Sequence, residues 1–119
     1  MLALLIVITV ASSLISAGFC LAGYFFPGFI VREGEGTHTV RVFALYALAR
    51  SVPLLLVILW AAFRADAVAL IWLGGLLGFI QLTDAAVGLQ AGKPSAIWGP
   101  LGVGVVQLTV VLLALLFGL

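Results

Sequence analysis

Four apolar segments, each about twenty residues or longer, account for nearly all of this 119-residue chain. The first is the most extreme, because residues 1–31 contain no Asp, Glu, Lys, Arg or His. A hydrocarbon core of roughly 30 Å is crossed by a helix of about twenty apolar residues. Inside it, backbone N–H and C=O groups must be paired within the protein, which selects helices over isolated strands. The chain is therefore predicted to cross a membrane four times.

Short polar stretches separate these segments, and they define one domain over residues 1–119. The predicted helices span about residues 2–26, 42–63, 67–89 and 96–117, with Ser95 as the N-cap of the last one. The connections are short, so neighbouring helices must run antiparallel. The predicted fold class is all-α, a transmembrane four-helix bundle with up-down-up-down topology.

Composition excludes several classes of protein. With 66% hydrophobic and 8% charged residues, the chain has more apolar side chain than a soluble domain of this size can bury. A net charge of +1 indicates no nucleic-acid partner. Cys20 is the single cysteine, and His38 is the single histidine and lies outside the apolar segments. No cofactor, metal site or catalytic set is therefore predicted.

Two charged side chains lie within the predicted helices. Arg50 is nine residues after Arg41, and Asp84 is eight residues before Gly92. At a rise of 1.5 Å per residue, the two charges lie about 13 Å and about 12 Å below the membrane surface. The loops after the first and third helices are on the same side, so both charges are at one level. An unpaired charge there costs at least a few kcal/mol, which predicts an Arg50–Asp84 ion pair facing the bundle interior.

Three further polar side chains fall near this level. Tyr46 lies four residues before Arg50, Gln81 lies three residues before Asp84, and Gln107 lies near the middle of the fourth helix. If these faces turn inward, the five residues line a small polar cavity and form a candidate ligand-binding site. Such a site suits a headgroup, a quinone-like carbonyl or an ion. The alternative is that the ion pair only latches the second helix to the third.

The remaining small and polar residues of the helices are interpreted as packing positions. Ser12, Ser16 and Cys20 form a stripe with four-residue spacing on the first helix, and Gly74 and Gly78 form a Gly-x-x-x-Gly pair on the third. Small residues at this spacing let helices approach closely in a membrane.

Three sequence features together resemble those of a known family. They are the Phe26-Pro27-Gly28-Phe29 break, the Arg41, Tyr46 and Arg50 face, and the Gln81-Leu82-Thr83-Asp84 segment. The chain resembles small bacterial DoxX-like four-helix membrane proteins over most of its length. The resemblance implies a four-helix bundle in the bacterial inner membrane, sometimes associated with quinone-linked oxidoreductase complexes. It also implies that the first loop faces outward, whereas the count of Lys and Arg residues in the loops places it in the cytoplasm.

Three functions are compatible with these features. The first is a non-catalytic membrane subunit that packs against another membrane protein or a second copy of itself and holds a membrane lipid. The second is a binding or transport module for a small amphipathic molecule at the Arg50–Asp84 level. The third is an intramembrane enzyme in which Asp84 is the acid or base and Arg50 its electrostatic partner.

Overall fold

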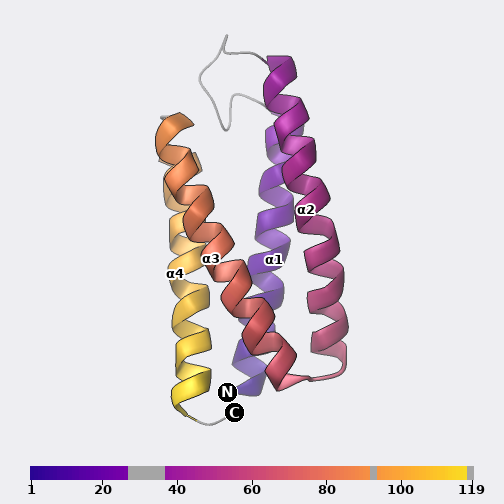
Figure 1. The fold of residues 1–119 in the computed structure, drawn as a ribbon, viewed down its shortest axis with the longest axis vertical. Coiled ribbons are helices and arrows are strands. Elements are labelled where there is room, and N and C mark those ends of the chain that lie inside the picture. Colours follow the sequence, from indigo (N-terminus) through magenta and orange to yellow (C-terminus); the bar gives the residue numbers. More distant parts are fainter. Residues whose placement is uncertain (27–36, 92–93, 118–119) are drawn as a thin grey trace.

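The computed structural model describes residues 1–26, 37–91 and 94–117. Within these ranges it has four helices and no strand: α1 (Leu2–Phe25), α2 (Thr37–Phe63), α3 (Ala67–Ala91) and α4 (Pro94–Leu116). The helices run alternately up and down, so that α1 begins and α4 ends at the same end of the bundle (Figure 1). The predicted all-α four-helix bundle is confirmed. Each helix is long and apolar enough to cross a membrane.

Two helices begin earlier than the sequence pattern predicts. The α2 helix begins at Thr37 rather than near residue 42, because residues 37–41 contain no glycine or proline and extend the helix beyond the apolar segment. The α4 helix begins at Pro94, so the predicted N-cap Ser95 lies inside it. Proline suits this position because the first turn of a helix needs no N–H donor from it.

A tight turn joins α2 to α3 and fixes the end of each helix. Ala65 has a positive φ of 51°, the left-handed conformation that ends many helices. The N–H of Ala65 donates to the carbonyl of Ala62, and the N–H of Asp66 donates to that of Ala61, which together form a Schellman motif. The Asp66 carboxylate then accepts a hydrogen bond from the N–H of Ala69 at 3.1 Å and caps α3.

The distribution of side chains differs from that in a soluble protein. Beside apolar residues, the interior contains small and hydroxyl-bearing ones, with Thr9, Ser12, Ser13 and Ser16 all buried on α1. Large apolar side chains point outward instead, and the most exposed is Phe63 at 91%. Small and polar residues at helix contacts and apolar residues outside are typical of a bundle whose outer surface meets lipid. The protein is thus an integral membrane protein.

The bundle is closed at the end that holds the α2–α3 turn. A buried apolar cluster joins all four helices there, and it comprises Leu5, Ala61, Leu70, Val110, Val111 and Ala114. Away from this end, α1 lies beside α2 and α3 lies beside α4, so the helices form two pairs (Figure 1). The apolar cluster therefore holds the two pairs together at the end with the α2–α3 turn.

Glycines bring α3 and α4 into close contact. A Cβ atom on Gly78 would lie only 2.6 Å from Leu108 Cδ2, and one on Gly74 would lie 2.6 Å from Gln107 Nε2. A Cβ on Gly104 of α4 would likewise lie 3.1 Å from Gln81 Cβ. The Gly-x-x-x-Gly pair therefore packs helices of one chain together, as predicted.

Candidate intramembrane binding site

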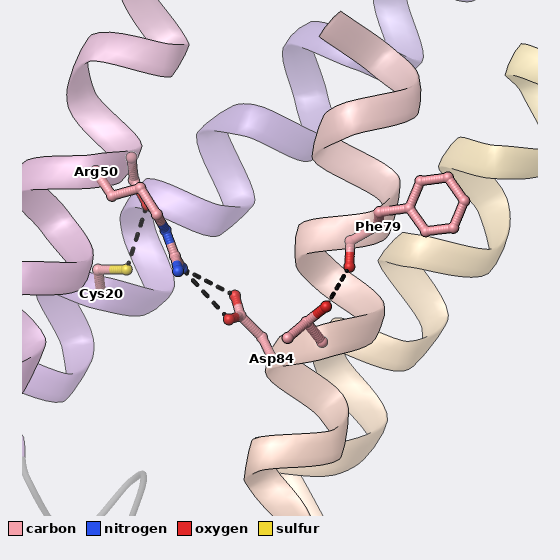
Figure 2. Close-up of polar contacts among 6 residues, drawn as sticks. Cys20, Arg50, Phe79 and Asp84 are labelled. Atoms are coloured by element: carbon pink, nitrogen blue, oxygen red, sulfur yellow. Dashed lines mark hydrogen bonds and ion pairs between the residues drawn. The ribbon is translucent and has the colours of Figure 1, made fainter. Parts of the chain in front are cut away.

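Arg50 and Asp84 form the predicted ion pair. Arg50 Nη2 lies 3.3 Å from both carboxylate oxygens of Asp84 and donates to them. Figure 2 shows the two side chains extending toward one another from α2 and α3. They remain partly accessible, with 49% of the Arg50 side chain and 33% of the Asp84 side chain exposed. The depth-matching argument therefore identified the correct partners.

The ion pair connects two helices that have little other contact. The α2 helix packs mainly against α1, and α3 packs mainly against α4. Arg50 lies 13 residues before the end of α2, about 20 Å along the helix from the α2–α3 turn. The pair therefore joins α2 to α3 far from their covalent connection.

A pocket of about 520 Å³ lies beside the ion pair, between the two helix pairs. All four helices contribute to it, and Arg50 and Asp84 both line it. Its other walls are mainly apolar and include Ile15, Phe19, Phe43, Ala47, Val87 and Val103. Its volume falls within the range of roughly 300–1,000 Å³ that is common for small-molecule sites. We refer to this space as the ion-pair pocket.

The polar groups of the ion-pair pocket gather at its inner end. Gln81 lies on α3 one turn before Asp84, and it is 3% exposed because its side chain packs over Gly104. Its Nε2 amide finds no hydrogen-bond partner among the described residues. Ser16 of α1 also lines the pocket and is buried. The Nε2 atom itself is buried, so the Gln81 side chain must rotate for a ligand acceptor to reach it, and that contact would remove the cost of about 1–3 kcal/mol that an unpartnered buried donor carries.

The outer part of the pocket is mostly apolar. Val40 and Phe43 of α2 lie ten and seven residues before Arg50, about 15 Å and about 10 Å further toward the loop that joins α1 to α2. Gly99 of α4 belongs to the same part, and a Cβ there would contact the ring of Phe19 at 3.8 Å. The exception is Gln90, which lies near the outer end of α3. The pocket thus has a polar floor deep in the bundle and apolar walls above it.

Two of the five predicted site residues lie elsewhere, so the predicted cavity is partly wrong. Tyr46 is 70% exposed and points away from the pocket, because it lies about 40° further around α2 than Arg50, which is itself at the edge of the pocket-lining face. Gln107 is fully buried one turn below the pocket floor, where its Nε2 donates to Thr9 Oγ1 at 2.9 Å. Only Arg50, Asp84 and Gln81 come together.

A contact between α1 and α2 was not predicted. Cys20 Sγ lies 3.6 Å from Ser51 Oγ, and both side chains are buried beside the pocket. Cys20 and Arg50 both line the pocket. Ser51 follows Arg50 directly in the sequence, and a hydroxyl next to an intramembrane charge was the one signal that could have identified it.

The apolar lining residues also escaped the sequence analysis. Phe43 and Phe79 are exposed to nearly the same extent, at 65% and 66%. Phe43 lines the pocket, whereas Phe79 points away from the ion pair (Figure 2). Phenylalanine therefore occurs both on the pocket wall and on the surface that faces away from it.

The chain matches no protein-family model, no curated protein and no solved structure.

Proposed function

We propose that this protein is a membrane-embedded binding module for a small amphipathic molecule, which it holds in the ion-pair pocket. The observation that carries the proposal is the combination of an apolar-walled pocket and an unpartnered buried amide at its floor. A latch between α2 and α3 needs the Arg50–Asp84 pair, but it needs neither the pocket nor the free Gln81 donor. Apolar walls with a few convergent polar groups are the usual features of a small-molecule site.

A second role, as a subunit that packs against another membrane protein or a second copy of itself, is favoured by the exposure of α2. In the most apolar 18-residue stretch of α2 only 17% is buried, compared with 39% in the corresponding stretch of α1. Phe43 and Tyr46 also form an aromatic pair near its start, with ring centroids 6.5 Å apart. The two roles are compatible, because a partner or a membrane lipid could cover α2 while the pocket holds its ligand.

An enzymatic role has weaker support. Both carboxylate oxygens of Asp84 already accept from Arg50 Nη2, which favours a stable ion pair over proton exchange with a substrate.

The resemblance to DoxX-like proteins supports a location in the bacterial inner membrane.

Filling the pocket tests the proposed function. Ala47 lines the pocket on α2, whereas Ala49 is exposed on the same helix. We expect Ala47→Phe to lower the affinity for dodecan-2-one more than about tenfold, because the phenyl ring takes the space of the ligand. Ala49→Phe should bind like the wild type. Binding is measured with radiolabelled dodecan-2-one on protein in lipid nanodiscs, after subtraction of partitioning into empty nanodiscs.

A second variant excludes misfolding as the explanation. Val103→Phe fills the pocket from α4, and Val105→Phe places the same ring on an exposed position of that helix. Loss of binding in both pocket variants, with retained binding in both exposed ones, supports the proposal. Equal binding by all four variants, or no binding by the wild type, contradicts it.

A further inference from the structure

We infer that the ion-pair pocket selects an uncharged headgroup that carries a hydrogen-bond acceptor, such as a ketone, ester or amide carbonyl, and binds it at the pocket floor. This inference rests on the proposed function and names the class of ligand. It is carried by the charge balance of the pocket, by the hydrogen-bond donors at its floor and by the depth of that floor.

The charge of the pocket is balanced without a ligand. Among the described residues that line it, Arg50 and Asp84 are the only charged ones, and they neutralise each other at 3.3 Å. An anionic headgroup on the remaining N–H groups of Arg50 would add a second negative charge beside Asp84, and a cationic one on Asp84 would add a second positive charge beside Arg50. Either would leave the pocket with a net charge that no other described lining residue balances. A neutral headgroup leaves the pair intact.

The pocket offers hydrogen-bond donors to a ligand. Gln81 contributes an Nε2 amide with no partner among the described residues. Arg50 contributes further donors, because a guanidinium has five N–H groups and only Nη2 contacts Asp84. A ligand that accepts hydrogen bonds is therefore matched by these groups.

The depth of the polar floor separates this ligand from an ordinary phospholipid. Asp84 lies seven residues before the end of α3 at Ala91, about 10 Å along the helix, and Gln81 lies deeper still. A phospholipid keeps its charged headgroup at the surface and its chains below it. The pocket presents the opposite order, with apolar Val40 and Phe43 nearer the surface than the polar floor. It suits a ligand whose carbonyl is inserted first and whose apolar part follows.

Four probes with the same twelve-carbon chain test the inference. They are dodecan-2-one, dodecanoate, dodecyltrimethylammonium and dodecane, each used in radiolabelled form on protein in nanodiscs, after subtraction of partitioning into empty nanodiscs. We expect dodecan-2-one to bind roughly five to ten times more tightly than dodecane, the gain from one net hydrogen bond. The two charged probes should bind no better than dodecane.

The variant Gln81→Leu identifies the donor. It should lower the affinity for dodecan-2-one about fivefold and leave that for dodecane unchanged, so dodecane controls for the shape of the pocket. Tighter binding of dodecanoate or dodecyltrimethylammonium, or an unchanged preference in Gln81→Leu, overturns the headgroup class while the binding role stands. If none of the four probes binds to the wild type, the proposed function itself fails.

Discussion

Replacing Arg50 or Asp84 alone by leucine is expected to lower the free energy of unfolding by about 2–3 kcal/mol. Each single change leaves the other charge without a partner at a depth where insertion of a lone charge costs about that much. The double variant Arg50→Leu/Asp84→Leu should recover most of the loss, since no orphan charge remains. The measurement is reversible unfolding in mixed micelles of increasing sodium dodecyl sulfate content.

Arg64→Leu is the matched control for this double-mutant cycle. It also removes one positive charge, but Arg64 is exposed in the α2–α3 turn and stacks over Trp60 at 5.6 Å rather than pairing with a carboxylate. It should cost less than about 1 kcal/mol. Additive losses in the double variant would show that the two side chains act separately, contrary to the ion pair. A stable double variant that no longer binds dodecan-2-one would assign the pair to the binding site.

The second large effect is expected at the contact between α3 and α4. Gly78→Leu should destabilise the protein by about 3 kcal/mol, because even the first carbon of the new side chain would lie 2.6 Å from two atoms of Leu108. Gly75→Leu is the control, since a Cβ on Gly75 has no described heavy atom of another element within 4 Å. That change should be neutral or stabilise α3 by up to about 1 kcal/mol through helix propensity.

The same unfolding experiment measures both glycine variants. Equal stability of Gly78→Leu and Gly75→Leu would contradict the close packing of α3 on α4. The floor of the ion-pair pocket depends on this packing, because Gln81 lies against Gly104 in the same contact. Gly78→Leu should therefore also weaken binding of dodecan-2-one.

The ion pair could be predicted because depth is encoded in the sequence. Counting residues from each loop places Arg50 and Asp84 at one level, and the cost of a lone charge in hydrocarbon requires them to meet. The rotation of a helix is not encoded as directly. Tyr46 and Gln107 were assigned to the cavity by spacing alone, yet α2 turns Tyr46 outward and α4 turns Gln107 toward Thr9.

The pocket itself could not be predicted, for a physical reason. It exists because α2 and α3 are held together at their turn by the cluster around Leu70 and then separate toward the other end. The packing of all four helices sets that separation. In a membrane protein, a side chain that faces an apolar-walled pocket, such as Phe43, is apolar just like a side chain that faces lipid. Apolar lining residues therefore carry no local signal.

The most direct test of the binding site is a distance measured between ligand and protein. The ligand is dodecan-2-one with ¹³C at its carbonyl, and the protein, in lipid, carries ¹⁵N in its glutamine side chains. Solid-state NMR then reports whether a ¹³C and a ¹⁵N nucleus are close. We expect dipolar coupling between the carbonyl carbon and Gln81 Nε2 at about 4 Å, as a direct hydrogen bond requires. The Gln107 amide, which lies outside the pocket, should show none. Coupling to Gln90 alone, or to no glutamine, would place the headgroup away from the pocket floor and contradict the account.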